Sequence, residues 1–571
     1  WNTFSLVRVS GDPDTIARPF GWGFSPFMPS NMVSRWLYLD IDGSACTVLT
    51  GFDGDRSTLG YLKWDVTNLG HYLKTNANVL VIGAGGGRDV LSALAFDQKA
   101  VAAVEINDNI LDVLNNVKGD YTGHLDRDPR ITFINDEARS YVARTGDRYD
   151  LIQMSLIDSW AATAAGAFVL SENSLYTVDA WVNFLRHLKP SGLLSVSRWH
   201  YHGLPAEMYR LVSLAATALA RNGVEEPRRH LMGVVVEREN AGGTKMADGV
   251  GTLLVSDSPF SPDQVRRIKD ISERMGFEVF LDPEWTADPV FTELASGKET
   301  AFAKSFILNI SPPTDDKPFF FHMLRVKDVF RHDLPSHGTV SFNVKAVMVL
   351  GTLLLVVVGL CVLCIIVPLM IVAGGRSLKQ HIGFAGYFAC LGFGFMLVEI
   401  SLMQRLSIFL GHPVYGLSVL LFTLLLSCGF GSFVVDRLGV AQSARKVLLF
   451  CFALLAVLAG FALVNRPVLA GCQSMGNTAR ILIAVGLVSP MGMFMGMAFP
   501  VGMKLANVSS QEMTPWFWGI NGACSVCASV FAMVMSLEYG ISATHWIGFA
   551  CYCAGVGLLM ERLSRLKASP A

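Results

Sequence analysis

The chain of 571 residues lacks an excess of charge of either sign, and its first 340 residues lack cysteine apart from Cys46. Lysine and arginine number 46 and aspartate and glutamate 47, which gives a formal net charge of −1. An even balance without a run of like charge gives no indication of a nucleic-acid partner or a charged tail. A single cysteine excludes a disulfide framework in this part and fits a reducing compartment.

The other ten cysteines all follow residue 360, within or beside apolar segments. Cys361 and Cys364, and likewise Cys524 and Cys527, have the spacing of a redox or metal-binding pair. Helical spacing in an apolar segment is more typical of small packing residues. We therefore interpret these cysteines as packing residues, and we expect no metal.

Composition divides the chain into a polar part and an apolar part. Charged residues concentrate before residue 340, whereas from Val344 onward the chain consists mostly of apolar runs of about 20 residues or more, enough to cross a bilayer. The pattern predicts a soluble part followed by a polytopic membrane domain in contact with the lipid bilayer. Seven apolar segments are expected, at residues 344–373, 382–403, 413–435, 447–469, 479–505, 516–539 and 543–560. The chain begins at Trp1 without a signal-peptide pattern, so we expect a fragment with something missing upstream, further membrane helices being one alternative.

The most informative stretch of the soluble part runs from Asn78 to Asn109. A short apolar run, Val79–Ile82, predicts a buried parallel strand, and Val101–Val104 predicts a second one that ends at Glu105. An acid at that position is placed to bind the two hydroxyls of a ribose. Between the strands lies an apolar helix, preceded by glycines that allow a tight turn and close approach of a ligand: Gly83, Gly85, Gly86 and Gly87.

Strand and helix patterns keep alternating after Glu105. Further strands are expected at residues 131–134, 149–156 and 192–196, with short helices between them. This alternation predicts an α/β fold with a parallel sheet whose ligand site lies along the carboxyl edge. Four acids fall at that edge and favour a nucleoside-type ligand: Asp89, Glu105, Asp136 and Asp158.

Regions of different character flank this α/β part. Residues 1–75 predict a small β-strand domain with a hairpin over residues 35–43 and a helix over 61–73, and residues 76–203 form the expected nucleoside-binding domain. Residues 204–340 predict an appended α/β region and linker, and residues 341–571 the transmembrane domain. In the linker, Asp315 and Asp316 favour a polar turn with capping acids over a metal or substrate pair.

Residues 35–200 resemble the spermidine synthase (aminopropyltransferase) branch of the Rossmann-like methyltransferase superfamily. The motifs that carry the resemblance are LDIDG, VIGAGGG, VEIND, NDEAR and YDLIQMSLIDS. With LSENSLYTVDAW, TDDKPFFF and FLGHPVYGLSVLLF, the whole chain is similar to the membrane-fused, spermidine synthase-like members. The resemblance implies a Rossmann-like methyltransferase fold with a small N-terminal β-domain, followed by an all-α transmembrane domain.

The resemblance also implies a cofactor and site residues. Decarboxylated S-adenosylmethionine, or S-adenosylmethionine itself, is the implied cofactor. Asp158 corresponds to the catalytic acid that orients and deprotonates the attacking amine. Glu105 corresponds to the ribose-binding acid and Asp136 to the acid beside the adenine. The full set of expected cofactor-binding residues is Gly83, Gly85, Gly86, Gly87, Asp89, Glu105, Asp136 and Glu137.

The acceptor site departs from the family pattern. Ser155 stands where the catalytic strand carries its first acid, and residues 63–65 replace a Tyr-Gln pair with Lys-Trp-Asp. A polycation needs several carboxylates, so these changes favour a less charged or more lipophilic acceptor over putrescine. Candidate substrate residues are Asp65, Ser155 and Tyr176, although a core tyrosine is an equal alternative for the last. His200 and His202 are interpreted as loop residues past the fifth strand.

The predicted topology contains a conflict. With seven spans, nine lysines and arginines fall on the far side from the soluble part and three on the same side. The positive-inside rule then places the soluble part outside the cytoplasm, whereas adenosyl cofactors are made inside. A miscounted span or missing upstream helices resolve the conflict better than an outward-facing domain. We therefore expect an integral protein of a bacterial inner membrane with its soluble domain in the cytoplasm.

Three functions are compatible with these observations. The first is aminopropyl transfer to a small amine, and the second is methyl transfer to a lipophilic acceptor. The third is a transporter or scaffold with a nucleoside-sensing domain, supported by Glu399, an acid inside an apolar segment, and by Pro490 in a predicted bent or broken helix. A structural pairing of Glu399 with Gln404 and Arg405 is the alternative to a functional role. Homodimerisation stays open.

Overall fold

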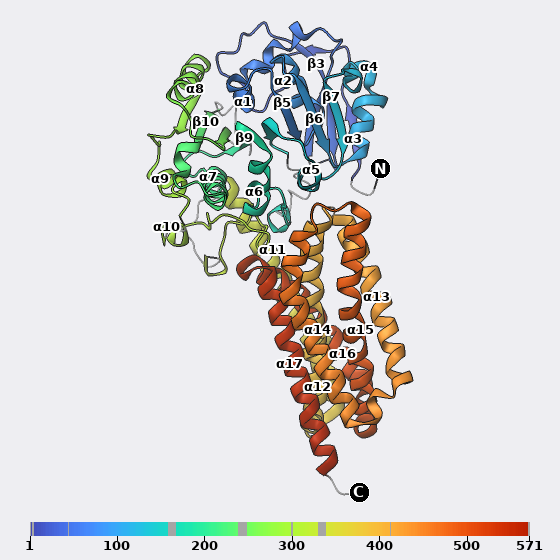
Figure 1. The fold of residues 1–571 in the computed structure, drawn as a ribbon. Coiled ribbons are helices and arrows are strands. Elements are labelled where there is room, and N and C mark those ends of the chain that lie inside the picture. The colour runs from blue at the N-terminus through green and yellow to red at the C-terminus, as the bar shows by residue number, and fades with distance from the viewer. Residues whose placement is uncertain are drawn as a thin grey trace. The chain divides into compact units, whose positions relative to one another are not determined.

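The computed structural model describes residues 2, 5–43, 45–157, 167–237, 248–298, 301–328, 338–411 and 413–568. The chain folds into two compact units, Trp1–Ala346 and Val347–Ala571. Figure 1 shows that the first unit mixes strands and helices and that the second is built from long helices. This is the predicted division into an α/β part and an all-α part.

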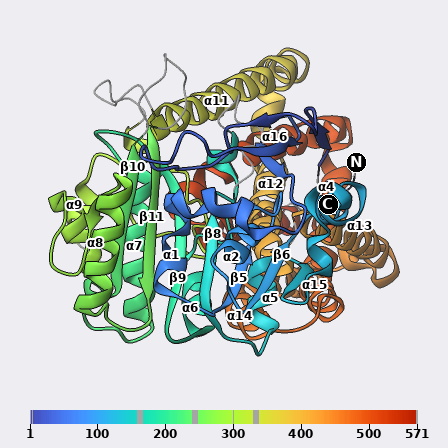
Figure 2. The same cartoon turned by 90° about the horizontal axis from the view of Figure 1, so that it is seen from above.

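An eight-stranded sheet forms the centre of the first unit, with the strand order β12-β10-β11-β9-β8-β5-β6-β7. The five strands that run parallel in this sheet match the five predicted ones: β5 (Asn78–Ile82), β6 (Ala100–Glu105), β7 (Ile131–Asn135), β8 (Tyr149–Ser155) and β9 (Leu188–His200). Their apolar runs are buried because helices cover the sheet, as is usual for parallel strands. Seen from above, the strands follow one another from β10 to β6 (Figure 2).

The region after residue 204 extends the same sheet in the antiparallel sense. β11 (Gly249–Ser256) pairs with β9, β10 (Leu231–Glu237) pairs with β11, and β12 (Glu278–Leu281) pairs with β10. Helix α7 (Ala206–Arg221) packs against β9 and β11, and α8 (Pro262–Met275) begins with a capping box at Ser261. A single sheet therefore runs through residues 78–281.

A second, smaller sheet precedes the large one. It contains β1 (Val7–Ser10), β2 (Ile16–Ala17), β3 (Ser34–Ile41) and β4 (Ala45–Thr50), and β3 and β4 form the predicted hairpin. The helix predicted over residues 61–73 is wrong in part. Two 3-10 turns, η1 (Arg56–Trp64) and η2 (Val66–Asn68), precede a short α1 (Leu69–Leu73). Asp65 has an extended backbone and its carboxylate accepts from the Thr67 N–H at 3.0 Å, which interrupts the helix.

The order of the parallel strands creates a crevice at one edge of the sheet. β5 lies between β6 and β8, so the chain leaves β5 toward β6 and β7 and later returns to its other side with β8 and β9. At such a point the connections after neighbouring strands diverge, and ligands bind there in open α/β sheets. Gly83 follows β5, Glu105 ends β6 and Ser155 ends β8, so three predicted residues meet at this edge.

Seven helices of the described residues are long and apolar enough to cross a membrane. The candidate spans are Val340–Ile371, Ile382–Leu410, Val414–Leu438, Ala444–Gly471, Asn477–Asn507, Thr514–Tyr539 and Ile541–Ser564. They match the seven predicted segments, so the alternative of a miscounted span is not supported. The helices that carry them are α11 (Gly338–Cys361), α12 (Val367–Leu410), α13 (Pro413–Leu438), α14 (Ala444–Gly471), α15 (Asn477–Ser510), α16 (Thr514–Tyr539) and α17 (Ile541–Ala568).

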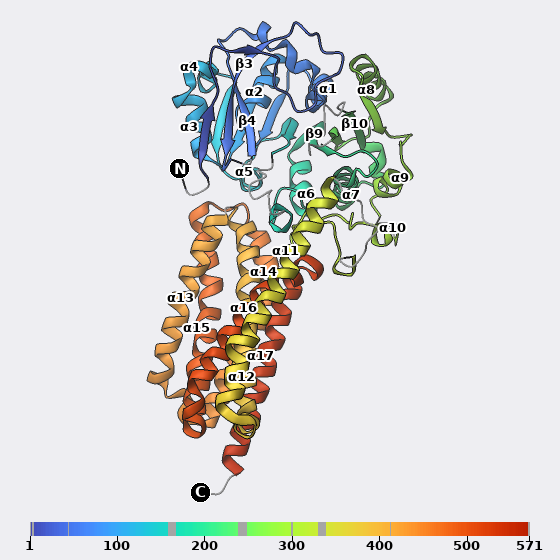
Figure 3. The same cartoon turned by 180° about the vertical axis from the view of Figure 1, so that it is seen from behind.

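Close helix contacts hold the second unit together. α12 packs against α16 and α17, and α13 packs against α15 (Figure 3). Gly492 and Gly496 have the GxxxG spacing that allows close helix packing, and a Cβ on Gly496 would lie 2.3 Å from the Cα of Cys428 in α13. α15 continues through Pro490 and Pro500, so the helix does not break there.

Candidate functional site

A cavity of about 300 Å³ lies at the carboxyl ends of β5, β6 and β8. Its walls come from the glycine loop after β5, from the first turn of α2 (Arg88–Ala95), and from the ends of β6 and β8. The hairpin of the small sheet closes it with Asp42 and residues 45–47. Its volume is at the lower end of the range for small-molecule sites.

The glycines of the loop serve two purposes. Gly83 and Gly85 have positive φ, +78° and +50°, and both line the cavity. Gly86 is needed for a different reason, because a Cβ there would lie only 2.0 Å from the carbonyl oxygen of Val48 in β4. Gly87 has a φ of +83° and starts α2. The first two glycines therefore face the cavity, while Gly86 lets the small sheet approach the loop.

Glu105 connects the glycine loop to the turn that follows β6. Its Oε2 accepts from the Gly85 N–H at 2.9 Å, and its Oε1 accepts from the Asn107 N–H at 3.0 Å. The residue is 7% exposed, and burial raises the pKa of its carboxyl group although these backbone N–H groups oppose the rise. The structure thus places the predicted ribose acid on the cavity wall, held in one orientation.

Arg88, which the sequence analysis missed, is the one basic side chain among the described residues that line the cavity. Its Nη2 donates to Oδ2 of Asp65 at 2.5 Å, and its Nη1 lies 3.7 Å from Oδ1 of Asp89. Burial raises the pKa of Asp89 to about 6, while Arg88 and a hydrogen bond from Ser155 act in the opposite direction. The signal that could have found Arg88 is its place directly after the glycines.

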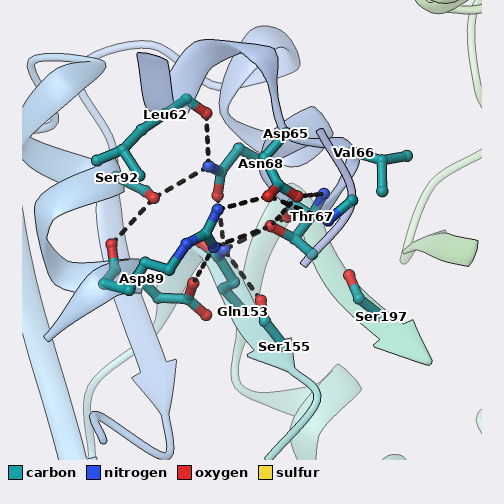
Figure 4. A network of polar contacts seen from close by, with 12 residues as sticks. Leu62, Asp65, Val66, Thr67, Asn68, Asp89, Ser92, Gln153, Ser155 and Ser197 are labelled. Carbon is teal, nitrogen blue, oxygen red and sulfur yellow. Dashed lines mark hydrogen bonds and ion pairs between the residues drawn. The ribbon is translucent and has the colours of Figure 1, made fainter. Parts of the chain in front are cut away.

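A buried network of hydrogen bonds holds Ser155 and the neighbouring cavity residues in place (Figure 4). Gln153, inside β8, donates to Oδ1 of Asn68 at 3.1 Å and to Oγ of Ser155 at 3.2 Å. Asn68 in turn donates to Oγ of Ser92 at 3.0 Å and to the carbonyl of Leu62 at 2.8 Å. The network ties β8 to η1, η2 and α2, so Ser155 is held at the cavity wall. A buried glutamine between the apolar residues Ile152 and Met154 was the available signal.

Two of the acids that were predicted to bind the cofactor, Asp136 and Glu137, do not belong to the described lining of the cavity. Asp136 forms an ion pair with Arg144. Glu137 caps α5 (Ala138–Arg144), since its carboxylate accepts from the N–H groups of Arg139 and Ser140 at 2.9 and 2.8 Å. Both acids therefore have structural partners. Asp158, the predicted catalytic acid, lies outside the described residues.

Tyr176 is a fully buried core residue. Its ring stacks on Phe320 with a centroid distance of 4.6 Å, and the guanidinium of Arg198 lies 5.4 Å above the same ring. It does not belong to the described cavity lining. Nearby, Asp315 forms an ion pair with Arg139 and accepts from the Thr177 hydroxyl at 2.8 Å, as expected of a structural acid.

The interpretation of His200 as a loop residue is wrong. It is the last residue of β9 and is buried, and burial lowers the pKa of its imidazole. His202, by contrast, lies in the following turn with its Nδ1 2.9 Å from Glu237. Neither histidine lines the described cavity.

No protein-family model matches the chain. A polyamine aminopropyltransferase of Corynebacterium efficiens is 28% identical over 142 residues, which are 24% of this chain and 26% of that protein. The chain thus spans about a quarter of the length of this curated relative. The predicted resemblance to the spermidine synthase family is confirmed.

Solved structures with similar folds include three of interest. A spermidine synthase in complex with the transition-state analogue AdoDATO is 14% identical, with a TM-score of 0.28, over 49% of this chain and 86% of the other. A probable spermidine synthase from Corynebacterium glutamicum is 18% identical, with a TM-score of 0.31, over 49% and 95%. Human methyltransferase-like protein 13 in complex with SAH is 18% identical, with a TM-score of 0.24, over 38% and 88%. The strand order of this chain itself is that of a Rossmann-like methyltransferase fold with a small N-terminal β-domain.

Proposed function

We propose that the chain is a membrane-bound transferase that uses decarboxylated S-adenosylmethionine to transfer an aminopropyl group to an amine. The observation that carries the proposal is the charge of the cavity beside the glycine loop. Among the described residues, Asp42, Asp89 and Glu105 line it together with one cation, Arg88. Such a cavity attracts a cationic ligand.

The described residues fit an adenosyl group. Glu105 uses one lone pair of each oxygen on a backbone N–H, which leaves lone pairs on both oxygens for the two hydroxyls of a ribose. Gly83 and Gly85 bring backbone instead of side chains to the cavity wall. The match with the aminopropyltransferase of Corynebacterium efficiens supports the same ligand class.

The excess of carboxylates favours the decarboxylated cofactor. S-adenosylmethionine carries a carboxylate of its own, which three acidic neighbours would repel. The decarboxylated form lacks that group and keeps its ammonium and sulfonium charges. Like charges in a cavity of low dielectric are costly, whereas opposite charges attract each other.

Aminopropyl transfer needs a proton acceptor beside the cofactor. When bound, the cofactor supplies a carbon activated by the sulfonium, which a neutral amine can attack. The chain must orient that amine and take its proton. Asp158 is our proposed acceptor on the sequence resemblance. Asp89 is the candidate among the described residues, because a carboxyl group with a pKa of about 6 can take up a proton near neutral pH.

Calorimetric titration of the full chain with each ligand tests this function. We expect decarboxylated S-adenosylmethionine to bind more tightly than S-adenosylmethionine, with 5′-methylthioadenosine as the nucleoside reference. Glu105→Gln should weaken all three, because an amide N–H₂ group would face the backbone N–H of Gly85 or Asn107. Glu273→Gln, on the exposed face of α8, is the matched control and should leave binding unchanged. Absence of binding by all three ligands would refute the proposal.

Methyl transfer to a lipophilic acceptor is the second candidate. The observation that favours it is the ion pair of Asp65, which neutralises an acid that a polyamine would otherwise use. Ser155, at the position of the family's first acid, adds no charge. Incubation with each cofactor separates the two functions, because aminopropyl transfer releases 5′-methylthioadenosine and methyl transfer releases S-adenosylhomocysteine.

The proposed location is a bacterial inner membrane, with the first unit in the cytoplasm. The seven apolar helices support membrane insertion. Cys46 offers a native reporter of the side, because it is exposed and the other ten cysteines follow residue 360. A membrane-impermeant maleimide should label Cys46 only after the membrane is permeabilised, and the variant Cys46→Ser is the negative control.

We also propose a homodimer, which light scattering of the purified chain tests.

A further inference from the structure

A second cavity, of about 480 Å³, lies between the helices of the second unit and is open on one side, where Leu425 and Trp518 are exposed. Residues of α12, α13, α15, α16 and α17 line it. Most of the wall is apolar or aromatic, with Phe395, Met396, Phe499, Trp518 and Tyr552 among the lining residues. The cavity is too large for a single ion, since one water takes about 30 Å³.

One acid, Glu399, belongs to this wall, and the described lining contains no lysine, arginine or histidine. Glu399 lies in the candidate span Ile382–Leu410, eleven residues before its end, or about 16 Å along the helix. None of the described residues forms an ion pair with it or hydrogen-bonds to its carboxyl group. An acid at such a depth is costly, so its retention points to a functional partner.

The predicted pairing of Glu399 with its sequence neighbours is not what the structure shows. Arg405 donates to Oγ of Ser542 at 2.8 Å, and Nε2 of Gln404 lies 3.8 Å from Sδ of Met533. Six residues after Glu399, Arg405 is about 240° further around a helix of 3.6 residues per turn. The two side chains therefore leave α12 in different directions.

Two further polar side chains of the wall, Asn521 and Ser525, present acceptors. Asn521 uses its Nδ2 to donate to the carbonyl of Phe388 at 3.0 Å, which leaves its Oδ1 as an acceptor. Ser525 uses its hydroxyl proton on the carbonyl of Asn521 at 2.9 Å or on that of Gly392 at 3.2 Å. Carboxylate, amide oxygen and hydroxyl oxygen together suit a ligand that donates hydrogen bonds.

We propose that this cavity binds an apolar molecule with a single protonated amine, and that the ammonium group pairs with Glu399. One carboxylate neutralises one ammonium, and a second charge on the ligand would be buried without a partner. The aromatic wall suits an apolar body and adds attraction for a cation near the ring faces. This site is independent of the function proposed for the first unit.

Photolabelling of the full chain in lipid nanodiscs tests the site. The probe is dodecylamine carrying a diazirine, and labelled peptides are mapped by mass spectrometry. We expect label on peptides that contain Phe395, Met396 or Phe499, and we expect excess dodecylamine to compete while dodecanol does not. Glu399→Gln should reduce this labelling by about tenfold or more. Glu561→Gln, an exposed acid of α17, is the matched control and should label like the wild type.

Equal labelling of wild type and Glu399→Gln would overturn the proposal, and so would equal competition by the alcohol. Better competition by a diamine of the same length would overturn the single-charge assignment. Protection of Cys428 supplies a measurement that needs no variant at Glu399, because Cys428 lines the cavity. Dodecylamine should slow its reaction with a small maleimide and leave the exposed Cys364 unaffected. Equal effects on both thiols would refute the site.

Discussion

Asp65 and Arg88 form a buried ion pair in which Nη2 of Arg88 donates to Oδ2 of Asp65 at 2.5 Å. Their side chains are 0% and 4% exposed. Asp65 also accepts from the N–H groups of Gly23 and Thr67 at 3.2 and 3.0 Å. The ion pair links the turn before α1 to the first turn of α2. Asp65 therefore holds the side chain of Arg88 at the cavity wall and does not itself belong to the described cavity lining.

Removal of the acid should destabilise the first unit strongly. Asp65→Asn leaves the guanidinium of Arg88 buried without its counter-charge, and we expect a loss of about 3–5 kcal/mol in the free energy of unfolding. Urea denaturation followed by tryptophan fluorescence measures the loss. The double variant Asp65→Asn, Arg88→Met should recover part of it, because no charge then stays unpaired. Asp270→Asn, on the exposed face of α8, should change stability by less than about 0.5 kcal/mol. If Asp65→Asn lowered the free energy of unfolding no more than Asp270→Asn does, the buried ion pair would be contradicted.

Gly86 should tolerate no side chain. Gly86→Ala places a Cβ 2.0 Å from the carbonyl oxygen of Val48, a backbone atom of β4 that cannot move alone. We expect the small sheet to shift, with a loss of about 1–3 kcal/mol in stability and weaker nucleoside binding. Gly60→Ala is the matched control, because no atom lies within 4 Å of the Cβ there. Equal melting temperatures for the two variants would show that the sheet does not approach the loop this closely.

Asp89 should make stability depend on pH in one direction. Burial raises the pKa of its carboxyl group from 3.8 to about 6, so between these pH values the folded state binds a proton that the unfolded state has released. This contribution to stability is present at pH 4 and is lost as the pH rises to 6, in total roughly 3 kcal/mol.

Asp89→Asn removes this titration. Relative to the wild type, the variant should gain stability from pH 4 to pH 7, as measured by denaturation at each pH. For Asp270→Asn the difference from wild type should stay constant over the same range. A constant difference for Asp89→Asn as well would mean that the carboxyl group titrates as it does in water.

Tyr176 should contribute to the core and not to ligand binding. Tyr176→Phe keeps the ring on Phe320 and removes only a hydroxyl that lies 3.4 Å from Nη1 of Arg198. Arg198 keeps Glu207, to which its Nη2 donates at 2.8 Å. We expect a loss of about 1 kcal/mol in stability and a change of less than about twofold in the dissociation constant of the cofactor. A tenfold weaker affinity would return Tyr176 to the site.

Local patterns were sufficient for much of the fold. The five parallel strands, the hairpin of residues 35–43 and the seven apolar helices each follow from a periodicity or a hydrophobic run of neighbouring residues. The glycines and Glu105 were also visible, because a tight turn and a strand end carry local signals. By contrast, Glu137 has a local role that the sequence analysis assigned to the ligand, since an acid at a strand end is also the residue that begins the next helix.

Amino-acid order alone predicted a ligand site at the carboxyl edge of a parallel sheet, where the structure has a cavity, and an apolar helical part. Tertiary structure decided which acids belong to that site. Asp65 and Arg88 are 23 residues apart and meet only because η1, which ends beside Asp65, packs on α2. Gly86 is constrained by a strand 38 residues earlier. The same holds for Glu399, whose cavity is assembled from five helices. Tertiary packing decides whether a charged side chain has an ion-pair partner. That partner comes from a distant part of the chain, so the pattern of neighbouring residues does not predict it.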